Sequence, residues 1–124
     1  MMKIVIMLNP RTKKNSPRLI PNAKFVKLLP SKAFEQYQKD AGWFLFNARG
    51  ANIDYPVNVQ CVYFMRTRGR VDLCNLLESS CDILVHYGVL KDDNCQIVVG
   101  HDGSRVLYDK NNPRVEITIE RVSR

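Results

Sequence analysis

The chain has 124 residues, of which 45% are hydrophobic and 25% are charged. This length and composition predict one globular domain with its own core, and they exclude a disordered chain or a small disulfide-dependent scaffold. No stretch approaches the roughly 18 to 20 apolar residues of a membrane helix. The apolar N-terminal patch is too short for a signal peptide and has no small-residue cleavage site. We therefore expect a cytoplasmic protein without a membrane partner.

The first predicted elements are a strand, a loop and a hairpin. Residues 3–8 are apolar enough for a strand at or near the centre of a sheet. Residues 9–17 form a basic loop with proline breakers. Residues 18–29 are compatible with a hairpin about Pro21 and Asn22.

A first helix is predicted to begin after Ser31 as N-cap and to end at Gly50. Its apolar residues recur at the spacing of one helical face. They are Phe34, Tyr37, Ala41, Phe44, Leu45 and Ala48.

The remaining elements follow in order: a strand at 58–66, a loop at 67–71, a helix at 73–87, a strand at 95–100, a turn at 102–103 and a closing strand at 114–122. The strand at 58–66 has apolar residues on both faces, so we expect it inside the sheet. Asp72 is the candidate N-cap of the second helix and Gly88 its terminator. This order predicts a single α+β, or mixed α/β, domain with a small mixed sheet and two main helices.

Charge and cysteines limit the kinds of site. Residues 1–32 hold eight Lys or Arg and no acid, whereas the other 92 residues hold 11 basic and 12 acidic side chains. A one-sided basic segment favours phosphate-rich partners, because neutralised phosphates release counterions; a merely solubilising surface is the alternative. The four cysteines form no CxxC pair. We therefore expect reduced thiols rather than a structural zinc site.

A helical wheel of residues 73–87 separates two arcs. The predicted buried stripe is Leu73, Leu76, Leu77, Ser80, Ile83, Leu84 and Tyr87. The polar arc is Asn75, Glu78, Ser79, Asp82 and His86, with Asp72 at its edge. Glu78 and Asp82 are like-charged neighbours, an arrangement that Mg²⁺ would stabilise. A second acidic pair, Asp92 and Asp93, follows, and Asp93 would lie near the C-terminal end of the helix if the chain reverses at Gly88. Solvated acids are the alternative.

Three alternating arginines, Arg66, Arg68 and Arg70, lead into Asp72. In an extended segment alternate residues share a face, so the three guanidiniums would grip a phosphate backbone from one side. Surface arginines on an exposed loop are the alternative. The two histidines, His86 and His101, are expected to be surface or supporting groups rather than catalysts.

At these residues the sequence resembles the RusA-like Holliday junction resolvases, small endodeoxyribonucleases frequent in phages and prophages. The pattern that carries the resemblance is an arginine-rich lead-in, then D-x-D-N-L-x-K-x-x-x-D-x-L, then G-x-x-x-D-D. In this chain it runs from Asp72 through Asp82 to Asp93. The basic loop at 9–15 and the stretches at 102–105 and 108–114 also look like family segments, so the resemblance covers almost the whole chain.

The family implies a cytoplasmic homodimer with a mixed α/β fold that binds four-way DNA junctions and serves DNA recombination and repair. It also implies Mg²⁺-dependent, paired phosphodiester cleavage by clustered aspartates. By position Asp72, Asp82 and Asp93 match these aspartates, whereas Cys74 replaces a second aspartate and Glu78 replaces a lysine.

Cys74 is a poor ligand for a hard cation, but Glu78 restores a carboxylate one helical turn further on. We therefore hypothesise a rearranged catalytic metal cluster of Asp72, Glu78, Asp82 and Asp93. The predicted DNA-binding residues are Arg11, Lys13, Lys14, Arg66, Arg68 and Arg70. One alternative is a branched-DNA-binding protein of this fold whose cleavage is lost or weakened. Another is a basic RNA- or protein-interaction module with solvated acids.

Overall fold

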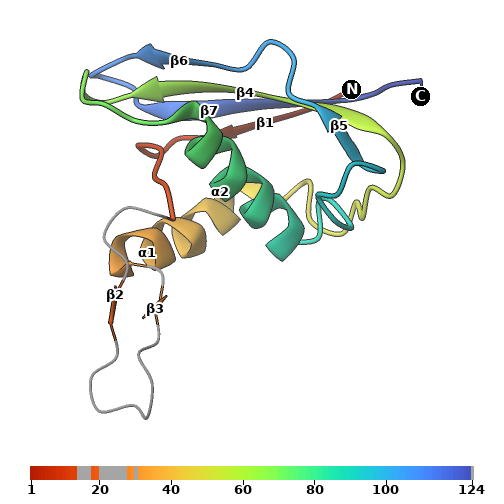
Figure 1. The fold of residues 1–124 in the computed structure, drawn as a ribbon, viewed down its shortest axis with the longest axis horizontal. Coiled ribbons are helices and arrows are strands. Elements are labelled where there is room, and N and C mark those ends of the chain that lie inside the picture. Colours follow the sequence, from red (N-terminus) through yellow and green to blue (C-terminus); the bar gives the residue numbers. More distant parts are fainter. Residues whose placement is uncertain (14–17, 20–27, 30, 124) are drawn as a thin grey trace.

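The computed structural model describes residues 1–13, 18–19, 28–29 and 31–123. In chain order the elements are β1 (Met2–Ile6), β2 (Arg18–Leu19), β3 (Leu28–Leu29), α1 (Lys32–Ala41), the 3-10 helix η1 (Gly42–Leu45), β4 (Val57–Met65), α2 (Leu73–His86), β5 (Val98–Gly100), β6 (Arg105–Tyr108) and β7 (Arg114–Arg121). Both α-helices lie on the same face of a mixed five-stranded sheet (Figure 1). The predicted α+β class is confirmed.

The sheet is built around β4. Its strand order is β1-β7-β4-β5, and β6 also pairs with β4. β7 pairs with β4 antiparallel, whereas β5 and β6 pair with it in parallel. The prediction of an inner strand here is therefore confirmed. The prediction that the first strand lies at or near the centre of the sheet is wrong, because β1 is an edge strand that pairs only with β7 among the described strands and leaves Val5 42% exposed.

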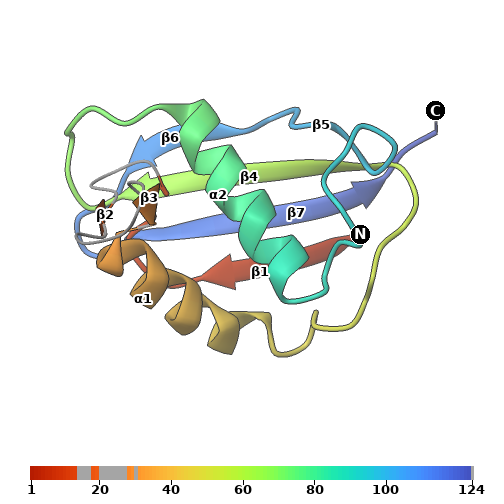
Figure 2. The same ribbon diagram turned by 60° about the horizontal axis from the view of Figure 1, so that its bottom comes forward.

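The core lies between the sheet and α2, which crosses β4 and β7 (Figure 2). Alternate β4 residues from Val57 to Tyr63 are buried, as are Leu76 and Leu84 of α2. Full burial of one such side chain stabilises the fold by about 1.5–3 kcal/mol. A buried hydrogen bond of 2.8 Å joins the Tyr63 hydroxyl to Ser80 Oγ and fixes α2 over β4.

The first helix is shorter than predicted. Ser31 is confirmed as its N-cap, because its Oγ accepts the Phe34 N–H at 3.1 Å. The α-helix ends at Ala41 rather than near Gly50. A Cβ on Gly42 would lie 2.7 Å from the Tyr87 ring, so this close approach requires glycine where the chain tightens into η1. Phe44, which was predicted to face the core, is 39% exposed.

The second helix begins and ends almost as predicted. Asp72 occupies its N-cap position, and Gly88 follows Tyr87 with a φ of 71°. In the predicted stripe, Leu76, Ser80, Ile83 and Leu84 are buried, whereas Leu73, Leu77 and Tyr87 are partly buried. Ser79 was placed on the polar arc but is 1% exposed. The loop after β1 covers it, and its Oγ donates to the Arg11 carbonyl at 2.8 Å.

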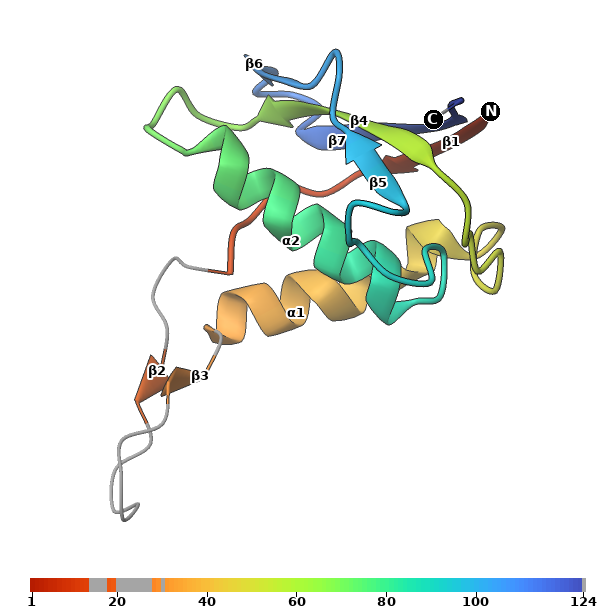
Figure 3. The same ribbon diagram turned by 45° about the vertical axis from the view of Figure 1, so that its right-hand side comes forward.

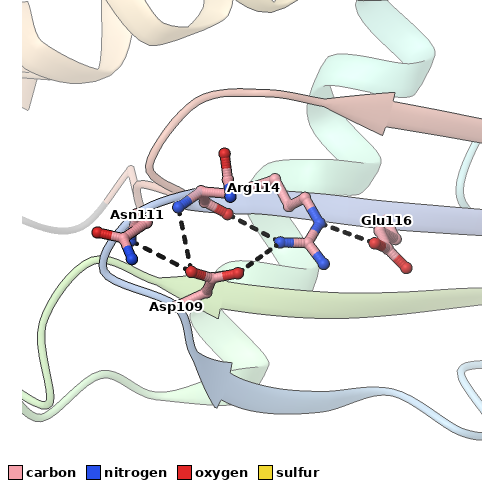
Figure 4. A network of polar contacts seen from close by, with 5 residues as sticks. Asp109, Asn111, Arg114 and Glu116 are labelled. Carbon is pink, nitrogen blue, oxygen red and sulfur yellow. Dashed lines mark hydrogen bonds and ion pairs between the residues drawn. The ribbon is translucent and has the colours of Figure 1, made fainter.

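The C-terminal strands depart from the prediction. β5 is only three residues long. β6 was not predicted, because its sequence, Arg-Val-Leu-Tyr, does not alternate between polar and apolar residues; in the fold all four residues are exposed. The predicted turn at 102–103 is present. Arg114 bonds Asp109 at 3.0 Å and Glu116 at 2.7 Å (Figure 4). With the Asn112 N–H, which is the larger cause, Arg114 lowers the pKa of Asp109. This network fixes the turn from β6 to β7.

The predicted hairpin is confirmed in its described arms. Arg18 pairs with Leu29 and Leu19 with Leu28, and the two strands lie beyond the start of α1, away from the main sheet (Figure 3). The turn predicted at Pro21 and Asn22 lies outside the described residues. Within the described part of the chain, no helix has the length and apolar character to cross a membrane.

Candidate active site

One hollow beside α2 gathers two of the predicted carboxylates. Glu78 and Asp93 line it together with Cys74, Cys81 and His101, and it has a volume of about 300 Å³. We call this the acid hollow. Asp93 reaches it from the loop between α2 and β5. The chain therefore brings Asp93 beside the middle of α2, whereas the sequence suggested the C-terminal end of the helix.

The environment of Asp93 disfavours its negative charge. Asp93 is an exposed residue, but some loss of hydration around its carboxyl group, followed by the hydrogen bond and charge of Asp92 and then the charge of Asp82, raises its pKa. The neighbouring Asp92 behaves oppositely. Its carboxylate accepts the Asp93 N–H at 2.7 Å and the Asn94 amide at 3.1 Å, and these contacts lower its pKa. A cation beside Asp93 would stabilise its ionised form.

The thiols of the acid hollow do not extend this acidic set. Burial is the largest of the causes that raise the pKa of Cys81 to about 12, so its thiol stays protonated near neutral pH. Cys74 is exposed, and sulfur is a poor ligand for a hard cation. Neither cysteine can therefore serve as a further ligand for a hard cation in this hollow.

His101 is a member of the acid hollow that the sequence did not single out. Its Nδ1 lies 2.8 Å from the Val59 carbonyl. When Nδ1 carries the proton and donates to this oxygen, the other ring nitrogen is left as an acceptor. No local spacing signals this arrangement, because the bond joins residues 42 positions apart.

The other two predicted carboxylates lie elsewhere along α2. Asp72 lines a smaller hollow with Thr12, Arg70 and Asn75, and its Oδ2 accepts the Asn75 amide at 3.3 Å. Asp82 pairs with Lys13 at 3.0 Å. A rise of about 1.5 Å per residue separates Asp72 from Asp82 by roughly 15 Å along the helix. Among the described residues, no three His, Cys, Asp or Glu side chains form a group suited to a metal ion.

The lining of the acid hollow nevertheless fits one common way in which proteins bind Mg²⁺. Mg²⁺ is commonly held by one or two carboxylates, with phosphate and water oxygens as its other ligands. Glu78 and Asp93 supply that number of carboxylates in one hollow. The residues present thus fit an ion whose coordination a phosphate substrate completes, rather than a cage formed by four carboxylates.

The three alternating arginines lie in different surroundings. Arg70 lies beside Asp72, Arg68 places its guanidinium 4.2 Å from the Tyr108 ring centre, and Arg66 lines another hollow with Arg11. The segment bends at residues 66–67 and contains no strand beyond Met65. The bend therefore interrupts the extended segment between Arg66 and Arg68, and all three arginines are exposed.

The basic loop after β1 lies against the acidic helix. The Arg11 carbonyl accepts the Ser79 hydroxyl, and Lys13 pairs with Asp82. Predicted DNA-binding residues are thereby placed along the side of α2. Lys14 lies outside the described residues.

Comparison with known proteins gives one family match. The family model described as "Endodeoxyribonuclease RusA" matches residues 4–120, which is nearly the whole chain. A search of curated proteins found no match.

Proposed function

The chain belongs to the endodeoxyribonuclease RusA family, and on this premise we propose that it is a Mg²⁺-dependent nuclease that cuts four-way DNA junctions. The family assignment supports DNA cleavage and Holliday junction resolution. The observation that carries the proposal for this chain is the meeting of Glu78 and Asp93 in one hollow beside a basic loop.

Glu78 and Asp93 are the proposed Mg²⁺ ligands. When bound, this ion lowers the pKa of a coordinated water and offsets the negative charge that develops on the phosphate during in-line hydrolysis. Asp92 and Asp82 surround Asp93 with negative charge, as its raised pKa indicates. This surrounding charge makes the hollow selective for a cation over a bare phosphate anion.

His101 is a proposed proton acceptor in the same hollow. The Val59 carbonyl orients its ring, and the remaining nitrogen takes a proton from the water whose oxygen attacks phosphorus. The leaving oxygen departs from the opposite side. The imidazolium formed in this step is stabilised by the carboxylates of Glu78 and Asp93.

Asp72 and Asp82 flank this centre in the proposal. Asp82 acts through its charge on Asp93, and Asp72 marks the start of α2, where the DNA strand would enter beside Arg70. The basic residues position the DNA backbone without reading bases. They are Arg11, Lys13, Lys14, Arg66, Arg68 and Arg70.

A homodimer would match the two-fold symmetry of the junction, because each subunit then reaches one of two equivalent strands. The sheet face opposite the helices supports a contact of this kind. No described helix covers it (Figure 3), and Val5, which is 42% exposed, alternates with the buried Ile4 and Ile6 and therefore lies on this face.

A second candidate function is binding of branched DNA with weak or no cleavage. Cys74 lines the acid hollow where the family pattern has an aspartate, and Glu78 stands where it has a lysine. These changes remove one hard oxygen ligand and one positive charge from the reacting centre.

Cleavage of a four-way junction and of a linear duplex, each with and without Mg²⁺, tests both candidates. Symmetric nicks in the junction that require Mg²⁺ support the nuclease, and tight junction binding without nicks supports the second candidate. Equal binding of both substrates without nicks contradicts both. Nicking that survives combined Asp72→Asn and Asp93→Asn substitution would overturn the carboxylate assignment. Asp54→Asn, which changes an exposed aspartate outside both hollows, is the matched control.

A further inference from the structure

A second site of different chemistry lies between the loop after β1, the start of α1 and the loop after β4. It is a hollow of about 210 Å³ with six polar residues in its lining, namely Asn9, Arg11, Thr12, Ser31, Thr67 and Arg70. We call it the threonine hollow. Among the described residues, no aspartate or glutamate lines it, and Asp72 lines the adjoining hollow together with Arg70. Arg11 and Arg70 therefore give the threonine hollow positive charge.

The hydroxyl of Thr12 also indicates that this hollow binds a ligand. Thr12 is 3% exposed, and its Oγ1 is the buried side-chain polar atom that lacks a hydrogen-bond partner within the described ranges. A buried hydroxyl without a partner is costly, so such a group in a native fold calls for an explanation. Thr12 lines both the threonine hollow and the smaller hollow of Asp72. A ligand in this region would supply the acceptor.

The other polar groups are left as hydrogen-bond donors. Ser31 Oγ already accepts the Phe34 N–H, so its hydroxyl hydrogen remains to donate. Asn9 Oδ1 already accepts the Arg66 N–H at 2.9 Å, which leaves its amide NH₂. With the two guanidiniums, these groups form a set of donors. The matching ligand is an anion rich in acceptor oxygens, and a phosphate has this chemistry.

We propose that the threonine hollow binds one backbone phosphate of the DNA strand, apart from the phosphate that is cut. This assignment to DNA rests on the proposed function. The hollow shares Thr12, Arg70 and Val71 with the hollow of Asp72, so it continues directly to the start of α2.

The two hollows lie at different points along α2. The threonine hollow adjoins the start of the helix through Arg70 and Val71, whereas Glu78 of the acid hollow lies six residues beyond Asp72, about 9 Å along the helix at about 1.5 Å per residue. The held phosphate is therefore a different phosphate of the strand from the one at the acid hollow.

A methylphosphonate scan tests the assignment. Four-way junctions that each carry one uncharged methylphosphonate near the crossover are titrated by fluorescence anisotropy in EDTA, so that no cleavage occurs. For the unmodified protein we expect about a tenfold loss of affinity at one position, equal to about 1.4 kcal/mol. Arg70→Gln should weaken binding of the ordinary junction but remove the extra loss at that position.

Two further variants sharpen the result. Thr12→Val removes the hydroxyl at constant shape and should reduce the extra loss of affinity at that position. Thr12→Ser keeps a hydroxyl and should retain the extra loss. Arg121→Gln, which changes a guanidinium stacked on Tyr55 at the far end of β4, should leave the positional effect intact. Arg70 is exposed, so Arg70→Gln should fold even if Thr12→Val does not. The proposal would be overturned if the loss of affinity at the methylphosphonate position were equal in the unmodified protein and in Arg70→Gln.

The outcomes separate this inference from the proposed function. If the protein cleaves junctions but Arg70→Gln does not change the loss of affinity at any single methylphosphonate position, the phosphate site in the threonine hollow is contradicted and the proposed nuclease function is not. Coupling without cleavage of any substrate supports the hollow and contradicts the nuclease. A rise in unfolding temperature with inorganic phosphate that requires Arg70, without coupling to a DNA position, assigns the hollow to a free anion and overturns the DNA assignment.

Discussion

The acid hollow and the threonine hollow adjoin the same helix but have opposite electrostatics. Among the described residues, Glu78 and Asp93 are the acids that line the first, whereas Arg11 and Arg70 are the basic residues that line the second. A carboxylate pair attracts a cation, and a set of donors attracts an anion. In the proposed function, this difference would separate the chemistry of cutting from the grip on the DNA backbone.

Both hollows contain an arrangement that is locally unfavourable without a ligand. In the acid hollow, Asp93 lies beside other acids, and its pKa is raised. In the threonine hollow, the Thr12 hydroxyl lacks a partner among the residues described. A cation relieves the first and a phosphate oxygen the second, so ligand binding should stabilise the fold at both places.

The largest expected effect comes from Asp93→Asn, which removes a proposed metal ligand while keeping its shape. We expect junction cleavage to fall by about 10²–10⁴-fold, the range typical for loss of one catalytic group. Junction affinity in EDTA should stay nearly unchanged, because the backbone grip lies elsewhere. Single-turnover nicking and fluorescence anisotropy measure the two quantities. A parallel loss of cleavage and affinity would contradict the division between the hollows.

A gain of function is expected from Cys74→Asp. Cys74 is exposed in the acid hollow, so an added carboxylate is tolerated and supplies a hard oxygen ligand. We expect a rise in nicking rate of about tenfold, equal to about 1.4 kcal/mol, and a lower Mg²⁺ requirement. A Mg²⁺ titration of the nicking rate measures both. Cys74→Ser is the control, and equal rates for the two variants would show that the carboxylate is not what this hollow lacks.

Ser80→Ala should affect both hollows alike. It breaks the 2.8 Å bond to the buried Tyr63 hydroxyl that fixes α2 over β4. A buried group left unpaired costs about 1–3 kcal/mol, so the free energy of unfolding in urea should fall by that amount. Cleavage and affinity, measured well below the unfolding midpoint, should change together or not at all. Ser123→Ala, an exposed change, controls for the substitution itself.

The smallest expected effect is a rise in unfolding temperature on Asp93→Asn near neutral pH. Because the folded-state pKa of Asp93 is raised, its ionised form destabilises the fold above that pKa. The advantage of the variant should therefore begin to shrink as pH falls through the raised pKa. It should vanish below the ordinary aspartate pKa, where both states are protonated. A Tm series against pH measures this, and an advantage that grows in acid would contradict the assigned direction.

The local patterns of the chain were largely readable from its residues. Asp72 and Gly88 bound α2 because a helix start and a left-handed residue after its end are local events. The buried leucines of α2 follow from helical periodicity, and Ser31 caps α1 through a contact only three residues away. The family motif also lies in one continuous stretch around this helix.

Elements that depend on distant partners were missed or misplaced. β1 lies at an edge, and α1 ends at Ala41 where Gly42 meets Tyr87. β6 has no burial alternation and is a strand because it pairs with β4. Ser79 is buried because Arg11, 68 positions earlier, covers it. Each outcome is set by packing between segments, which periodicity does not encode.

The sequence by itself determined the family, the boundaries of α2 and the residues with the required chemistry. Only the tertiary structure decided which of them meet. It placed Asp93 and His101 with Glu78, left Asp72 beside Thr12 and Arg70, and paired Asp82 with Lys13. The physical reason is that a helix fixes the direction of a side chain every 100° or so, whereas the neighbour it finds there depends on how loops far along the chain fold back onto that helix.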